Sequence, residues 1–214
     1  MRLFRKSNDP KFLRDISQVF SFRVRTFGDT PAGVLWKNSE GQQLRFEVLF
    51  GLLVDQPPSD PVSINDFGCG YGAMFDFLLN IPSMAGMNYF GYDISREMIN
   101  SAKQHNHDKR ATFSEASKIE TPADYTFVSG TFNLNLDVDD GLWSTYVKST
   151  LNQLWSMSNK GLAFNMLDIS HPDQEIGLFY ANAEEYMSFC RTLSTNVNLI
   201  DNYHLNEWTI FIHR

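Results

Sequence analysis

A glycine-rich loop constrains this chain more than any other feature. The stretch NDFGCGYGAMFDFLLN (65–80) places Gly68, Gly70 and Gly72 at every second position, with Asp66 two residues before the first. Apolar residues predict a strand before the loop and a helix after it. A strand–loop–helix junction presents free backbone N–H groups, and glycine lets a ligand approach the backbone closely. The loop therefore predicts a nucleotide-type binding site.

The spacing of the glycines excludes two common kinds of nucleotide-binding loop. A dinucleotide loop has its third glycine three residues after the second, and a Walker loop needs a lysine that is absent here. The next predicted strand (87–93) ends at Asp93, which stands 21 residues after Gly72. An acid at about this distance accepts hydrogen bonds from ribose hydroxyls in open α/β sheets. The loop and Asp93 together predict a nucleotide-type site in which Asp93 binds a ribose.

The rest of the chain alternates between strand and helix patterns. Predicted strands span 62–67, 87–93, 111–116, 124–130, 161–167, 197–202 and 207–214, and predicted helices span 11–27, 42–54, 72–80, 95–105, 141–158 and 182–194. Alternation of this kind predicts an α/β fold with a doubly wound, mostly parallel sheet. No helix separates the last two strands, so they form an antiparallel pair.

We predict a single domain over residues 1–214, with a helical cap or lid over 1–55 and the core over 60–214. Proline residues at 57, 58 and 61 end the second helix.

Composition excludes several kinds of partner. The 214 residues carry a net charge of −7 with scattered Lys and Arg, which argues against duplex nucleic acid. Cys69 and Cys190 have no short spacing, so we expect no disulfide framework and no metal site. Apolar runs are too short for a membrane span and no signal peptide is evident. We expect a cytoplasmic protein without membrane contact; its oligomeric state is left open.

The order D-x-G-x-G-x-G resembles the first motif of class I S-adenosylmethionine-dependent methyltransferases. Together, LWKNSEGQQLRFEVL, NDFGCGYG, FGYDISREMINSA, DYTFVSGTFNLNL, KGLAFNML, FYANAEEYMSFC and WTIFIHR are similar to one bacterial group of that class, over about residues 26–214. The resemblance implies a Rossmann-like sheet and S-adenosyl-L-methionine as cofactor. It leaves the methyl acceptor undefined, because the group is not tied to one substrate.

The resemblance also implies roles for individual residues at the cofactor. Asp66 is the candidate for the α-ammonium group, and Asp93 is the candidate for the ribose hydroxyls. We expect Ile94 and Met98 to pack on the adenine. The third strand should end in Gly-Asp, but this chain departs from that pattern; Ser117 or Glu115 is then the alternative contact to the adenine amino group.

The segment before the first strand is a candidate lid. Trp36 is a large apolar residue in a polar loop, and Gln42 and Arg45 lie three apart on a predicted helix. Arg45 is predicted to pair with the cofactor's carboxylate, since Arg forms bidentate forks with carboxylates. In the alternative reading Trp36 packs on the cap and Arg45 is solvated.

Polar groups after the fourth and fifth strands are candidates for chemistry. Ser129 and Asn133 follow the fourth strand, and Asp168 and His171 follow the fifth. The carboxyl ends of adjacent strands line one crevice, so these groups can converge. His171 is the best base on intrinsic pKa, with Asp168 and Asn133 as further catalytic candidates. Alternatively His171 is an exposed loop residue, Asp168 caps a turn and Asn133 holds its own loop.

These features predict a methyltransferase that acts on oxygen or nitrogen of a small molecule or glycan precursor. The alternative is a non-catalytic cofactor-binding or assembly protein that keeps the fold, and an enzyme acting on protein or RNA is a third possibility. Adenine N-methyltransferases carry the motif [DNS]-P-P-[YF] after the fourth strand. This chain has SGTFNLN there, without a proline pair, which counts against methylation of a nucleobase or a glutamine amide.

Overall fold

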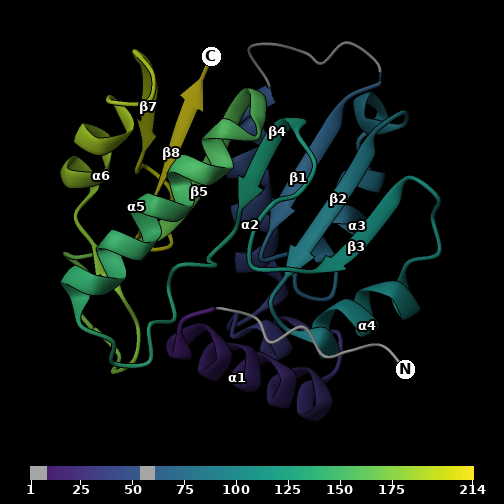
Figure 1. Ribbon diagram of the computed structural model, residues 1–214, viewed down its shortest axis with the longest axis horizontal. Coiled ribbons are helices and arrows are strands. Elements are labelled where there is room, and N and C mark those ends of the chain that lie inside the picture. The colour runs from purple at the N-terminus through teal and green to yellow at the C-terminus, as the bar shows by residue number, and fades with distance from the viewer. Residues whose placement is uncertain (1–8, 54–60) are drawn as a thin grey trace.

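A mostly parallel sheet forms the middle of the molecule (Figure 1). The computed structural model describes residues 9–53 and 61–214, and these residues form one eight-stranded sheet with the order β3-β2-β1-β4-β5-β8-β7 and β6 beside β5. The strands are β1 (Ser63–Phe67), β2 (Asn88–Asp93), β3 (Ala111–Glu115), β4 (Ala123–Val128), β5 (Ser158–Asp168), β6 (Tyr180–Ala181), β7 (Asn196–Ile200) and β8 (Glu207–His213). β8 runs antiparallel to both of its neighbours, which confirms the predicted mixed sheet.

Helices cover both faces of the sheet. They are α1 (Lys11–Phe27), α2 (Ser39–Phe50), α3 (Ala73–Leu79), α4 (Arg96–His105), α5 (Asp140–Ser156) and α6 (Ala183–Cys190). Side chains of α5 and α6 share one hydrophobic core with the sheet, and side chains of α2, α3 and α4 share the other. The sheet is therefore buried on both sides, as parallel sheets require.

Helix α1 lies across the end of the sheet at which β1, β2 and β3 finish (Figure 1). Ser17 donates a hydrogen bond to the carbonyl of Ile94 at 3.0 Å, and the hydroxyls of Ser21 and Ser95 lie 2.9 Å apart. Ser95 also caps α4, where its side chain accepts from the N–H of Met98. These contacts place α1 over the carboxyl ends of the strands, where ligands bind in such sheets.

The lid helix differs from its prediction. Helix α2 begins earlier than residue 42, because the side chain of Asn38 accepts from the N–H of Gly41 at 2.8 Å and caps it. Gln42 and Arg45 on this helix are buried, whereas its apolar residues Leu44 and Val48 are only half-buried.

The prediction that prolines end this helix falls on residues 57 and 58, which lie outside the described residues. The short strand β6 was not predicted, since a two-residue strand carries no periodic pattern.

Candidate functional site

The glycine loop is tied to the end of β2. The N–H groups of Gly68 and Cys69 both donate to the carbonyl of Tyr92, at 2.7 and 3.0 Å. Gly68 has φ +83°, and a Cβ there would stand 2.1 Å from the hydroxyl of Thr131. Gly70 has φ +54°, and a Cβ would stand 3.0 Å from a methyl group of Val34. Only glycine combines this left-handed backbone with so little space.

Two buried carboxylates flank this loop. Asp93 accepts from the N–H groups of Gly70 at 3.0 Å and of Ser95 at 2.8 Å, which fixes its orientation. Burial raises the pKa of Asp93 to about 6, although these backbone hydrogen bonds partly offset the effect. Burial raises the pKa of Asp66 further, to about 7, while a hydrogen bond from Tyr89 opposes the shift. Both carboxylates are hydrogen-bond acceptors. Because a buried charge is costly without a partner, each of them favours a ligand that offers a cation or a hydroxyl group.

Both carboxylates line one cavity of about 490 Å³ at the carboxyl ends of the strands. The predicted site residues that reach its wall are Trp36, Gln42, Arg45, Asp66, Gly68, Gly70, Asp93, Ile94, Ser129, Asn133 and His171. A cavity of this size holds a ligand as large as a nucleoside. The structure thus brings together residues that are spread over more than half of the chain.

Four predicted residues stand away from this wall. Gly72 precedes α3, where its Cβ would meet the ring of Phe113 at 3.2 Å. Met98 is fully buried behind the loop. The Ser117 hydroxyl donates to Asp9 at 2.7 Å, and Asp168 accepts from the N–H of Ser170 at 2.7 Å.

The other candidate for the adenine, Glu115, is also engaged elsewhere. It pairs with Arg96 at 2.9 Å, and both side chains are exposed. Ala116, the residue between Glu115 and Ser117, lines the cavity in their place.

The segment from Pro31 to Arg45 closes one side of the cavity. The Trp36 ring lies against Gly130, where a Cβ would come within 2.3 Å of it. The guanidinium of Arg45 stacks on the Trp36 ring, 3.9 Å from its centroid. Gln42 accepts from the hydroxyl of Tyr71 at 3.2 Å. These contacts hold the segment against both the glycine loop and the residues after β4.

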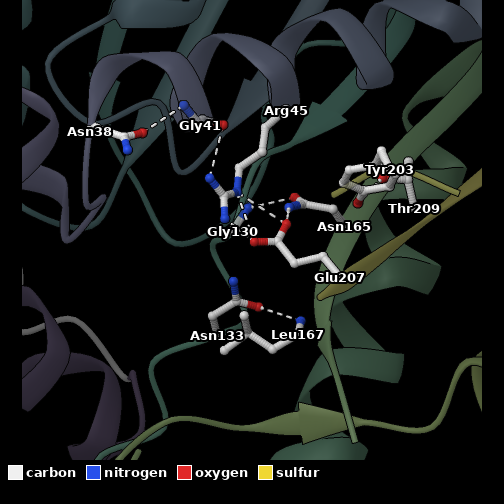
Figure 2. A network of polar contacts seen from close by, with 10 residues as sticks. All are labelled: Asn38, Gly41, Arg45, Gly130, Asn133, Asn165, Leu167, Tyr203, Glu207 and Thr209. Carbon is white, nitrogen blue, oxygen red and sulfur yellow. Dashed lines mark hydrogen bonds and ion pairs between the residues drawn. The ribbon is translucent and has the colours of Figure 1, made fainter. Parts of the chain in front are cut away.

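A buried polar network surrounds the guanidinium of Arg45 (Figure 2). Arg45 Nε donates to Glu207 at 2.8 Å, Arg45 Nη2 pairs with the same carboxylate, and Arg45 Nη1 donates to the carbonyl of Gly41 at 2.9 Å. Asn165 donates to Glu207 at 2.6 Å and accepts from the N–H of Gly130 at 2.8 Å. Burial raises the pKa of Glu207, and Arg45 opposes this shift.

The network gives Arg45 a partner that the sequence reasoning missed. All three guanidinium nitrogens are engaged, so the fork assigned to the cofactor's carboxylate is occupied by Glu207 and Gly41 in this structure. The role of Arg45 at the cofactor stays a prediction. An acid that opens the apolar strand EWTIFIH was the available signal for Glu207, since a charge inside a buried strand requires a partner.

The far wall of the cavity comes from the residues after β4 and β5. Asn133 accepts from the N–H of Leu167 at 3.3 Å through its side-chain oxygen. Within the described part of the chain, the amide nitrogen of Asn133 and the hydroxyl of Ser129 are buried without a hydrogen-bond partner. His171 accepts from the N–H of Asp173 at 3.0 Å and contacts the ring of Tyr180. The sequence did not single out the lining residues Glu175, Leu178, Tyr180, His204 and Leu205.

Comparisons with known proteins agree with this geometry. Residues 65–136 match the model of a methyltransferase domain. The chain is 36% identical over 163 residues to "Putative methyltransferase Rv1506c" of Mycobacterium tuberculosis, which covers 73% of this chain and 95% of the relative. The matched region includes the glycine loop, Asp93 and the residues after β4.

Solved structures share the fold at low sequence identity. Magnesium protoporphyrin IX methyltransferase of Synechocystis with bound S-adenosylhomocysteine superposes with a TM-score of 0.68 at 14% identity, covering 94% of this chain and 99% of that one. The plantazolicin methyltransferase BpumL gives a TM-score of 0.57 at 14% identity, covering 94% and 97%.

The fold and the site define a methyltransferase, and the chain belongs to the class I S-adenosylmethionine-dependent methyltransferases. Among the described residues, no helix is both long and apolar enough to cross a membrane.

Proposed function

We propose that this protein transfers a methyl group from S-adenosylmethionine to an oxygen or nitrogen of a small molecule or glycan precursor. The observation that carries the proposal is the cavity in which the glycine loop, Asp66 and Asp93 meet. Asp93 is oriented by two backbone N–H groups, so it can accept from a ribose diol without rearrangement. This is preorganised recognition of a nucleoside.

The residues present fit the cofactor in three ways. Gly68 and Gly70 carry no side chain and both line the cavity, so a ligand can approach the backbone there. Asp66 is a buried acid that suits an ammonium group. Ile94 and Ala116 offer an apolar wall for a base. When bound, the cofactor supplies an activated methyl group with a good leaving group.

The chain's own residues would orient the acceptor and exclude water. The lid, part of the helical cap proposed for residues 1–55, holds Trp36 between Arg45 and Gly130. Exclusion of water strengthens electrostatic interactions within the cavity. Ser129, Asn133 and His171 lie on the wall after β4 and β5, where an acceptor would enter.

Two observations support a small acceptor. The cavity of about 490 Å³ must hold both the cofactor and the acceptor. The net charge of −7 gives no attraction for a duplex nucleic acid. Proteins of the same fold include methyltransferases named for a porphyrin and for plantazolicin. A cytoplasmic location accords with a cofactor of intracellular metabolism.

Calorimetry with S-adenosylhomocysteine tests the cofactor assignment. We expect a one-to-one complex, and we expect NADH at the same concentration to give no heat of binding. Binding of NADH with no binding of S-adenosylhomocysteine would contradict the proposal. Labelled S-adenosylmethionine incubated with a small-molecule extract then tests methyl transfer.

A further inference from the structure

The cavity wall after β4 offers hydrogen-bond donors. The N–H of Leu167 donates to the side-chain oxygen of Asn133, and this contact fixes which end of the amide is which. The amide nitrogen, turned towards the Arg45–Glu207 network in Figure 2, is buried without a partner among the described residues. Asn133 is only 6% exposed, so this nitrogen requires an acceptor that the protein does not supply.

His171 contributes a second donor on the same wall. The N–H of Asp173 donates to its Nδ1 at 3.0 Å, so Nδ1 is the acceptor of the neutral ring and Nε2 carries the hydrogen. The ring stacks edge-on against Tyr180, and the neighbouring N–H of Phe179 donates to the carbonyl of Asn133 at 2.8 Å. His171 in this tautomer presents a donor and not the lone pair of a base.

The carboxylates that line the cavity either accept hydrogen bonds from other side chains, flank the glycine loop, or are exposed. Both oxygens of Glu207 accept from Arg45, and one also accepts from Asn165. Asp66 and Asp93 flank the glycine loop, where the proposed function assigns them to the cofactor. Glu175 and His204 line the cavity but are exposed. The donor wall therefore lacks, within the described residues, a buried side chain free to take a proton.

We propose that the methyl acceptor is a carboxylate, held by Asn133 Nδ2 and His171 Nε2, and that the product is a methyl ester. This inference rests on the proposed function and names its substrate class. One carboxylate oxygen forms the new O–C bond as the C–S bond of the sulfonium breaks, and the electron pair of that bond stays on sulfur. No proton moves, because a carboxylate is already ionised at neutral pH.

The same wall disfavours the other acceptors. An alcohol has to lose a proton, for which this wall provides no buried base. An amine needs hydrogen-bond acceptors for its N–H groups, whereas the free amide nitrogen of Asn133 and Nε2 of His171 are both donors. Donors at this wall would instead compete for the amine's lone pair. A carboxylate also carries the charge that a sulfonium attracts.

Alkali lability of the transferred methyl group tests the class of acceptor. The full-length protein is incubated with methyl-labelled S-adenosylmethionine and the low-molecular-weight extract of the cells that encode it, and the products are treated with mild alkali. Methyl esters release volatile labelled methanol, whereas methyl ethers and N-methyl groups keep the label. Volatile label supports the inference, and alkali-stable label overturns it while the proposed function stands. No transferred label would count against both.

Two variants separate the roles of the donors. Asn133→Asp keeps the oxygen that accepts from Leu167 but replaces the donor by a charge, so ester formation should fall by roughly tenfold or more. Its affinity for S-adenosylhomocysteine, measured by calorimetry, should change less than about twofold. His171→Gln replaces the ring N–H by an amide N–H and cannot act as a base. If His171 serves only as a donor, this variant should retain activity within about tenfold.

A variant Asn133→Asp with unchanged or raised activity would indicate a cationic acceptor and overturn the inference. Inactivity of His171→Gln, together with intact cofactor binding, would show that His171 acts as a base and would also overturn it.

Discussion

The two ends of the cavity are built in opposite ways. At the glycine-loop end, Asp66 and Asp93 are acceptors, and backbone N–H groups from the same short stretch of chain orient Asp93. At the donor wall, Asn133 and His171 present N–H groups; Asn133 is fixed by Leu167 of β5, and His171 is fixed by Asp173 of its own loop. The first end needs only one strand–loop–helix–strand unit. The second exists only when β4, β5 and β8 are assembled, and this difference decides which variants affect binding and which affect folding.

The largest expected effect is on stability, at the network that joins the lid to the donor wall. Arg45→Met leaves the buried Glu207 unpaired and should lower the free energy of unfolding by about 3–5 kcal/mol. Arg45→Met combined with Glu207→Leu should recover most of this loss, because it removes both charges. Urea unfolding of the three proteins measures the comparison. A double variant that regains stability but not affinity for S-adenosylhomocysteine would show that Arg45 also contacts the cofactor.

Next in size is the loss of binding at the glycine loop. Gly70→Val places a branched side chain at φ +54°, against Val34, and should weaken S-adenosylhomocysteine binding by at least about 100-fold. Gly28→Val is the matched control, because Gly28 has φ +67° but nothing within 4 Å of its Cβ position. Both variants place valine at a positive φ, but only Gly70 lines the cavity. Equal affinities measured by calorimetry would show that the ligand is not seated on this loop.

A smaller effect is expected from Asp93. Asp93→Asn keeps an oxygen for the N–H of Gly70, but it loses the acceptor for the N–H of Ser95 and the charge that strengthens hydrogen bonds to ribose hydroxyls. Affinity for S-adenosylhomocysteine should fall by about 1.5–3 kcal/mol, the range for a charge-assisted hydrogen bond. Calorimetry gives the value and circular dichroism checks the fold. An unchanged affinity would show that Asp93 does not bind the ribose, and the glycine-loop end would then no longer differ from the donor wall as an acceptor site.

The smallest effect is a pH dependence confined to the glycine-loop end. Asp93 and Asp66, with pKa raised to about 6 and about 7, lose their charge as the pH falls, so affinity for S-adenosylhomocysteine should drop by about tenfold from pH 7.5 to 5.5. Asp66→Asn should flatten the upper part of this profile. A profile that is the same in wild type and Asp66→Asn would exclude Asp66 from it.

Unfolding of the free protein gives the opposite sign for Asp66. Its folded pKa of about 7 lies above the ordinary value of 3.8, so stability from this group is complete below that value and is lost as the pH rises to about 7. Asp66→Asn should therefore raise the melting temperature at pH 8.

The sequence predicted where the glycine loop, Asp66 and Asp93 lie in the fold because these signals are local. Three glycines, Asp66 and Asp93 occur in one strand–loop–helix–strand unit, and that order fixes their relative positions. The alternation of helix and strand likewise predicted the sheet and its antiparallel β8.

The donor wall and the network depend on contacts over long distances in sequence. Arg45 and Glu207 are 162 positions apart, and nothing near either residue indicates the other. The burial of Arg45 could not be predicted from its neighbours in sequence for this reason, since Leu44 and Val48 on the same helix are apolar yet less buried than Arg45. Only the register of β8 beside β5 brings Glu207 next to Asn165 and so makes Arg45 a buried residue.

The contact between Trp36 and Gly130 has a consequence for solvent exchange. The N–H of Gly130 sits in a loop after β4, yet it donates to Asn165 at 2.8 Å and lies beneath the Trp36 ring. If the segment acts as a lid, we expect deuterium to reach this N–H when the tryptophan lifts away, so that its exchange rate would report the fraction of time that the lid is open. The exchange rate of this one amide would therefore measure how often the site opens for ligands to enter and leave.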